Sequence, residues 1–156
     1  MTAARTKQDP NQPLHRALAE FRHQLRRFLL VSENAANEAG LHPQQHQLLL
    51  TVAGVPAGIS PSIAFAAEAL GLKHNTVVEL VDRCEKEGLL QRAKDPEDGR
   101  RVCLRTTARG QRVLGRLSRV HLRELNLQGP LLIQALQNVV NTKSRGVTHR
   151  NRKRNG

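Results

Sequence analysis

Two short helical segments separated by a glycine turn constrain the fold of this chain more than any other feature. The segment from about Pro61 to Leu70 carries its apolar side chains at helical spacing, and so does the segment from about His74 to Glu87. Gly71 and Leu72 leave room only for a tight turn between them, and Gly88 supplies a stop signal for the second helix. Two helices joined in this way are typical of a helix-turn-helix.

A β-hairpin is predicted directly after the second of these helices. Segments 89–92 and 101–105 have the composition of short strands, and the link Asp95-Pro96-Glu97-Asp98-Gly99-Arg100 is dense in turn-forming residues. A charged hairpin in this position is a wing. Aromatic residues make up only 2% of the chain, which favours helices packed through Leu, Val and Ala. The predicted fold class is therefore mainly α with a small β-wing, a winged helix-turn-helix.

A long helix is predicted before this central part. Residues 14–38 carry apolar side chains at alternating steps of four and three, close to the repeat of helices that pack lengthwise against each other. A second helix is expected to begin at His42 or Pro43 and to run to Ala53. The Gly- and Pro-rich stretch 54–62 is expected to be a loop, with Ile59 as the candidate for a brief strand.

Two more helices are predicted after the hairpin. Thr107 is a good N-cap for a long helix that runs to about Gln128. Pro130 is expected to open a separate short helix over residues 131–141. Residues 1–13 are expected to form a disordered lead-in, and residues 142–156 a basic, disordered tail.

The charge of the chain narrows the class of partner. The net charge is +12, and residues 14–142 alone carry 17 Lys and Arg against 12 Asp and Glu, a net charge of +5. Such a surface attracts polyanions, namely nucleic acid, an anionic membrane or an acidic protein. The sequence shows no signal-peptide pattern and no apolar stretch long enough to span a bilayer. We therefore expect a cytoplasmic protein with no membrane partner.

The second helix of the pair presents the candidate residues for reading DNA bases. Val77, Leu80, Val81 and Cys84 define its buried stripe, and recognition helices contact base edges with their N-terminal part. Asn can bond adenine bidentately, Glu can accept from cytosine, and Thr or Val can pack on a thymine methyl group. The predicted base contacts are His74, Asn75, Thr76, Val78 and Glu79. The alternative is an ordinary solvated helix face.

The wing supplies the candidate residues for backbone and minor-groove contacts. Arg100 and Arg101 at the hairpin tip would fit a narrow minor groove, where the potential is most negative, and Asp98 is close enough in sequence to hold one guanidinium. The alternative is a generic charged turn. Sequence-independent phosphate contacts are expected from the tail and from three further residues: Lys73, Arg92 and Lys94.

An arginine stripe is predicted on the helix that begins at Thr107. Its members stand four, three, four, three and four residues apart: Arg105, Arg109, Arg112, Arg116, Arg119 and Arg123. One interpretation is a track for phosphates. A solvated face is expected instead, because Val113, Leu117 and Val120 show that another face of this helix packs inward.

No pattern of catalytic, cofactor-binding or metal-binding residues is found, so we expect neither an enzyme nor a cofactor. His42 and His46 stand one helical turn apart, but no third ligand is identifiable nearby. Cys84 is expected to be a core residue. Cys103 falls on a predicted wing strand, where nothing in the sequence fixes its exposure or reactivity.

Several runs of residues resemble the MarR family of bacterial regulators. These are Leu70-Gly71-Leu72, Thr76-Val77, Glu79-Leu80-Val81-Asp82-Arg83 and Glu87-Gly88-Leu89-Leu90, then the wing from Asp95 to Leu104, the helix start Thr107-Ala108-Arg109-Gly110, and the C-terminal runs His121 to Leu125 and Pro130 to Leu136. The resemblance covers about residues 14–141. Gly99, Thr106 and Ala66 depart from the family pattern.

The resemblance implies a homodimer in which the first and last helices of the two subunits interleave. It implies binding to roughly palindromic operators, mostly as a repressor, and release by a small, often aromatic ligand. The domain organisation that it implies is one MarR-type unit over residues 14–141. Its DNA-binding lobe would span about 44–106, between dimerisation helices at about 14–39 and 107–141. The alternative function is a non-sequence-specific architectural protein that uses its basic charge alone.

Overall fold

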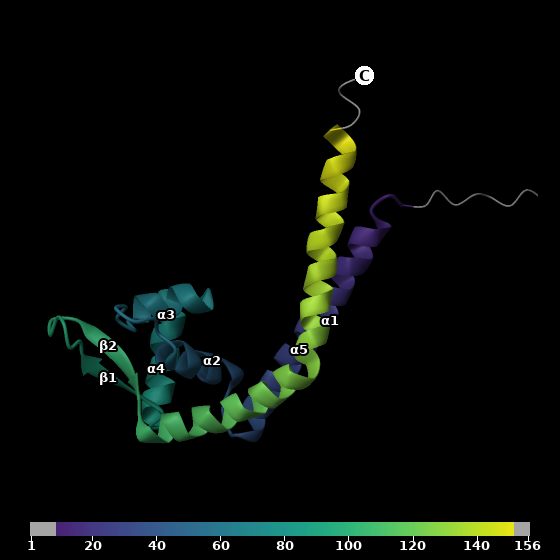
Figure 1. Ribbon diagram of the computed structural model, residues 1–156. Helices are drawn as coiled ribbons and strands as arrows, with labels where there is room; N and C mark the ends of the chain where they lie inside the picture. The colour runs from purple at the N-terminus through teal and green to yellow at the C-terminus, as the bar shows by residue number, and fades with distance from the viewer. Residues whose placement is uncertain (1–8, 152–156) are drawn as a thin grey trace, which may run out of the picture. The chain divides into compact units, whose positions relative to one another are not determined.

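The computed structural model describes residues 9–151 and the side chains of residues 9–142. Within that range the elements are α1 (Gln12–Glu38), α2 (Pro43–Ala53), α3 (Ile63–Leu70), α4 (His74–Lys86), β1 (Leu90–Lys94), β2 (Val102–Thr106) and α5 (Ala108–Asn151) (Figure 1). The chain divides into two compact units: residues 32–121, and residues up to 31 together with those from 122 onward. The predicted winged helix-turn-helix fold is confirmed, and residues 32–121 contain its helix pair and wing.

Local signals explain the helix pair. Ser62 caps α3, since its Oγ accepts a hydrogen bond from the backbone N–H of Phe65 at 3.1 Å. Gly71 ends the helix in the left-handed conformation, with φ of 63°, which glycine adopts without steric cost. Leu72 N then donates to Ala67 O at 3.0 Å and closes the turn. These contacts fix the direction in which the chain enters α4.

One face of α4 forms the centre of the core. Val77, Leu80, Val81 and Cys84 are at most 1% exposed, as the apolar spacing predicts. They pack in one cluster with buried side chains from the other elements of residues 32–121, among them Leu48, Leu49, Ala66, Leu89, Leu104 and Leu117. Burial raises the pKa of the Cys84 thiol to about 12, so this cysteine is a neutral core residue, as predicted.

The wing is a two-stranded antiparallel ladder that runs from the pair Leu90–Thr106 to the pair Lys94–Val102. The brief strand predicted at Ile59 does not form, and the described residues contain one sheet of two strands. A single backbone hydrogen bond, from Leu104 N to Pro61 O at 2.8 Å, attaches this loop to β2. One bond beside a proline is too little to build a third strand, because proline has no N–H to donate to a ladder.

The C-terminal helix corrects a second prediction. Pro130 does not open a separate helix but lies inside α5, which runs without a break from Ala108 to Asn151. Proline removes one helical hydrogen bond to the carbonyl four residues earlier. Pro130 and Asn126 are both exposed, so solvent can satisfy that carbonyl. The sequence does not show that the helix would continue despite the hydrogen bond that is lost at Pro130.

Both predicted terminal segments fall partly outside the described residues. Helix α1 begins at Gln12, within the predicted lead-in 1–13, and residues 1–8 are not described. Helix α5 continues past residue 142, where the tail was predicted to begin, so the predicted boundary was wrong. Residues 152–156 lie outside the described range. None of the described helices combines the length and apolar character that a membrane-crossing segment needs.

The start of α5 is packed tightly against the turn that follows α4. Thr107 Oγ1 donates to Gly88 O at 2.6 Å and accepts from Gly110 N at 3.0 Å, which confirms Thr107 as a cap. Thr107 N donates to Leu89 O at 3.1 Å. A Cβ atom added at Gly110 would lie 2.0 Å from Leu89 O, so the backbones approach more closely than any side chain allows.

A pair of histidines joins α2 to α5 inside the same unit. His46 is 3% exposed, and its ring centroid lies 4.8 Å from that of His121, with the ring planes at 42°. Burial lowers the pKa of both imidazoles, and the charge of His121 would lower the pKa of His46 further. Among the described residues, the Nε2 atom of His46 has no hydrogen-bond partner. The folded protein therefore favours the neutral form of both rings.

Substitution of Gly110 tests the close contact between α5 and the α4 turn. Gly110→Ala should lower the free energy of unfolding by about 1–3 kcal/mol, because the backbone must move to relieve the overlap. The matched control is Gly115→Ala on the same helix, where the new methyl group would meet only the end of Arg119 at 3.8 Å. That change should be neutral or stabilising by up to about 1 kcal/mol. Urea unfolding measures both, and equal effects would contradict the tight junction.

The histidine pair predicts that stability decreases in mild acid. The unfolded chain protonates these histidines near their ordinary pKa of 6.5, whereas the folded protein does so only at lower pH. Folded molecules therefore bind fewer protons below that pH, and the free energy of unfolding should fall as the pH decreases from 6.5 towards about 5. His46→Leu should flatten this dependence. The control is His23→Leu at an exposed position of α1, and the same pH profile for all three proteins would refute the assignment.

Candidate nucleic-acid interface

The first two turns of α4 present the predicted base-contact residues on the face opposite the core. His74, Asn75 and Glu79 are exposed, while Thr76 and Val78 are half-buried on the flanks. Glu79 lies 3.9 Å from Arg83 one turn further along, a weak and exposed ion pair that leaves the carboxylate free to move. The structure therefore brings the five side chains to one accessible surface, and their contact with bases stays a prediction.

The N-terminus of α4 is electrostatically suited to an anion. Lys73 is its N-cap residue, but no side chain caps the helix, in contrast to α2 and α3. The N–H groups of the first helical turn have no partners within the helix, and the helix dipole adds partial positive charge at this end. The exposed Lys73 adds a full charge. A phosphate is the natural partner for such a helix end.

The wing tip is held together by Asp98. Its Oδ1 accepts from Arg100 N at 3.1 Å, and its Oδ2 lies 3.3 Å from Arg101 Nε. Arg101 N donates to Asp98 O at 2.9 Å, and Arg101 O accepts from Asp95 N at 3.0 Å, which closes the hairpin. The expectation that Asp98 holds one guanidinium is confirmed for Arg101, whereas Arg100 is exposed at the tip.

Asp95 anchors the base of the wing, a role that was not predicted for it from the sequence. The residue is 7% exposed, and its Oδ1 accepts from Glu97 N at 2.8 Å and from Asp98 N at 3.3 Å. The Ser60 hydroxyl is the main cause of the lowered pKa of Asp95, followed by these backbone groups. An Asp side chain that accepts a hydrogen bond from the backbone two residues further on is a known turn signal. The effect of Ser60 on the pKa of Asp95 could not be predicted, because Ser60 belongs to a loop that is distant in sequence.

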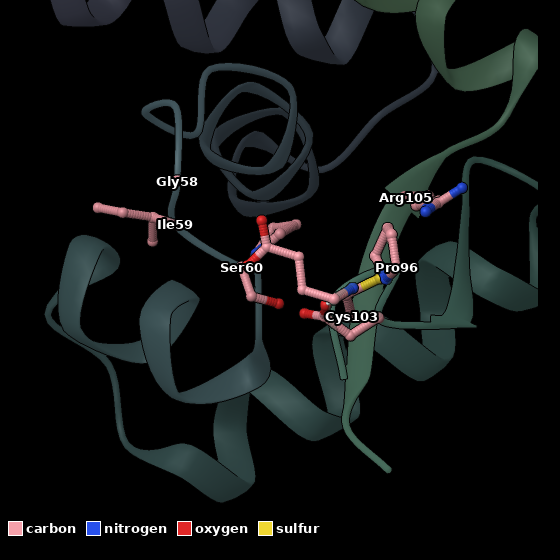
Figure 2. Close-up of a pocket in the computed structure, with 9 residues that line it drawn as sticks. Gly58, Ile59, Ser60, Pro96, Cys103 and Arg105 are labelled. Carbon is pink, nitrogen blue, oxygen red and sulfur yellow. The ribbon is translucent and has the colours of Figure 1, made fainter. Parts of the chain in front are cut away.

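A small cavity lies beneath this base. Its volume is about 230 Å³, and its lining includes the loop 58–61, the wing residues 95–97, and Cys103 and Arg105 of β2. Figure 2 shows Ser60, Pro96 and Cys103 gathered around one space, with Arg105 further along the strand. Cys103 is 2% exposed, and its Sγ lies 3.6 Å from Lys94 O. The cavity lies between the wing and the loop before α3, which the hydrogen bond from Leu104 N to Pro61 O joins at 2.8 Å.

Arg92 is not available for the phosphate contact that was predicted for it. Its Nη2 lies 2.8 Å from Asp82 Oδ1, its Nη1 pairs with Glu85, and its backbone N donates to Glu85 Oε1 at 2.7 Å. These contacts tie β1 to the exposed side of α4. The two acids lie on α4 at helical spacing, but only the observed packing of strand against helix shows that Arg92 meets them. Lys73 and Lys94 remain exposed.

Comparison with known proteins agrees with this geometry. Residues 39–101 match the model of the MarR family. A protein of Thauera aromatica, named as a transcriptional regulatory protein for the hcr operon, is 29% identical over 103 residues. That alignment covers 66% of this chain and 60% of the relative's length. The resemblance to the MarR family, predicted from the motifs, is thereby confirmed.

Solved structures show the same fold. The MarR family transcription regulator SP03579 is 19% identical, with 90% of this chain and 93% of that chain covered and a TM-score of 0.66. The transcriptional repressor CouR, solved on a 23-mer DNA duplex, is 26% identical, with 79% and 87% covered and a TM-score of 0.58. CouR from Rhodococcus jostii RHA1 has also been solved with p-coumaroyl-CoA, at 21% identity, 78% and 80% coverage and a TM-score of 0.57.

A pair of substitutions separates the structural role of Arg92 from a phosphate contact. Arg92→Gln should lower the free energy of unfolding by about 1 kcal/mol, a modest figure because the side chain is partly exposed to solvent. It should leave the salt dependence of DNA binding unchanged. Lys94→Gln, on the same strand and exposed, should have little effect on stability but reduce the slope of log K against log salt by about 0.9. The reverse pattern would restore Arg92 as a DNA contact.

Proposed function

We propose that this chain, whose residues 39–101 match the model of the MarR family, is a sequence-specific DNA-binding transcription regulator. The observation that supports this most directly is the accessible face of α4. Its opposite face is fully buried, so the helix is held rigidly with His74, Asn75 and Glu79 directed to solvent. A rigidly supported helix of this kind is suited to entry into the major groove.

The proposed readout divides between α4 and the wing. Asn75 would bond an adenine edge, Thr76 and Val78 would pack against thymine methyl groups, and Glu79 would accept from cytosine. Lys73 and His74, at the N-terminus of α4, would lie nearest the phosphates. Arg100 and Arg101 of the wing would enter the flanking minor groove, with Asp98 orienting Arg101. Lys94 would add a sequence-independent phosphate contact.

We also propose that the chain acts as a homodimer on a palindromic operator. Residues 12–31 and 122–142 expose many large apolar side chains, with exposed fractions from 37% at Leu25 to 72% at Leu127. Monomeric proteins rarely leave so many apolar side chains in contact with water, whereas subunit interfaces bury them. Leu18 and Leu25, which belong to the apolar side chains that recur at alternating steps of four and three residues along α1, are among them. Two copies would then place two recognition helices in successive major grooves, about 34–36 Å apart.

The sign of regulation and its control are proposed from the family. CouR, at 26% identity, is a repressor solved on DNA, and it has also been solved with p-coumaroyl-CoA. We infer that this chain is a repressor in the cytoplasm, where the operator is, and that a small-molecule effector of unspecified identity releases it. The alternative function is architectural, since the charge of +12 alone would bind any duplex.

Selection of bound duplexes from a random DNA pool at about physiological salt tests the proposal against this alternative. A sequence-specific dimer should enrich an inverted repeat and should bind it about 10³-fold or more tightly than unrelated DNA. Equal affinity for all duplexes, with binding that collapses as salt rises, would instead identify an architectural protein.

Two substitutions then test the assigned residues on the selected operator. Asn75→Ala should weaken operator binding by about 1–3 kcal/mol and relax the preference at one base pair in each half-site. Arg100→Ala should weaken binding and reduce the preference for the bases that flank the half-sites, with the fold unchanged. Gln47→Ala, at an exposed position of α2, is the control. Unchanged affinity and specificity in either test variant would exclude that residue from the interface.

A further inference from the structure

We propose that the arginine row at the start of α5 binds the phosphate backbone of a second DNA duplex. This row consists of Arg109, Arg112 and Arg116. The second duplex is separate from the one that α4 and the wing read, so a protein bound to its operator would hold another DNA segment on a different surface. The inference depends on the proposed function for the first duplex only.

The arginines form one continuous face of a helix that is firmly attached to the core. They stand three and four residues apart, and all are exposed. Gly110, Val113, Leu114 and Leu117 define the buried side of the same turns. At 1.5 Å per residue, the row extends for about 10 Å along the helix axis. The positions of the positive charges are therefore set by a rigid element rather than by a loop.

Arg109, Arg112 and Arg116 carry charges that no acid of the described residues neutralises. Three other arginines of residues 32–121 pair with acids: Arg83 with Glu79, Arg92 with Asp82 and Glu85, and Arg101 with Asp98. Among the described residues, the side chains of Arg109, Arg112 and Arg116 form neither an ion pair nor a hydrogen bond. The acids on the exposed side of α4 are already used by Arg83 and Arg92. The row is thus left to attract an external anion.

The row begins at the end of α4 that lies away from the predicted base contacts. Thr107 and Gly110 of the α5 start contact Gly88 and Leu89, which directly follow α4. The base contacts begin at His74, at the other end of a helix of 13 residues, a separation of about 20 Å. Figure 1 shows α4 running between α3 and the start of α5. A duplex seated at the N-terminus of α4 would therefore not face the row.

The composition of this surface favours DNA over a protein partner. Protein interfaces depend on apolar anchors at their centre. Among the described residues of α5, the exposed large apolar side chains begin at Leu122, six residues beyond Arg116, so none of them interrupts the row. Each strand of B-DNA carries one negative charge per about 3.4 Å of axis, so a row of about 10 Å would run beside about three phosphates of one strand. Guanidinium groups suit phosphates because they donate two parallel hydrogen bonds.

A capture experiment tests the inference with the full chain. The selected operator duplex is immobilised and saturated with protein, and a labelled duplex of unrelated sequence is added at about physiological salt. Wild-type protein should retain the labelled duplex. The triple variant Arg109→Gln, Arg112→Gln, Arg116→Gln should retain at least about fivefold less while its operator affinity changes less than about twofold. The control that replaces the same three residues by Lys keeps the charge and should retain most of the capture.

Three outcomes would decide against the inference or separate it from the proposed function. Equal capture by the wild type and the Gln variant would exclude the row. A Gln variant whose operator binding loses about 0.9 of salt slope per arginine, without any capture by the wild type, would show that the row contacts the first duplex. A wild type that binds no sequence preferentially yet captures labelled DNA through the row would refute the proposed function and leave the row as a DNA-binding surface.

Discussion

Burial of one face of α4 is the constraint on which the rest of residues 32–121 depends. Val77, Leu80, Val81 and Cys84 are removed from water almost completely, and each contributes on the order of 1–3 kcal/mol of hydrophobic free energy. Because this stripe fixes the rotation of the helix about its axis, it also fixes which residues face solvent. A rotation by one residue would bury Asn75 or Glu79 and expose the apolar stripe, so the candidate interface follows directly from the core.

Electrostatics then assigns different tasks to similar residues. Arg92 is held by two acids of α4 and attaches β1 to that helix, so its charge contributes to architecture. Arg101 is partly held by Asp98, which limits its freedom without removing its exposure. Arg100 and the arginine row on α5 have exposed side chains at the surface. The net charge of +12 does not by itself distinguish the arginines that are held in ion pairs from those that are exposed for a partner.

The parts that sequence predicted are those governed by local physics. The α4 stripe, the Gly71 turn, the wing turn and the Thr107 cap each follow from residues within a few positions of one another, and all are found. The features that were not predicted depend on contacts between segments that are distant in sequence or on how far a helix continues. Arg92 meets acids seven and ten residues away only because β1 packs on α4. The Ser60–Asp95 and His46–His121 pairs join distant segments, and Pro130 is tolerated because α5 continues on both sides of it.

Helix α4 and the wing are attached to the rest of residues 32–121 in different ways. At the C-terminal end of α4, the absence of a Cβ at Gly110 lets α5 contact Leu89 backbone atoms directly, which leaves no room for one element to slide on the other. The wing, in contrast, is attached to the loop before α3 by the hydrogen bond from Leu104 N to Pro61 O, beside a cavity of about 230 Å³. Its base is buried through Leu90, Cys103 and Leu104, while Arg100 and Arg101 lie exposed at its tip. These two guanidinium groups can therefore change position at the tip without any displacement of the buried face of α4.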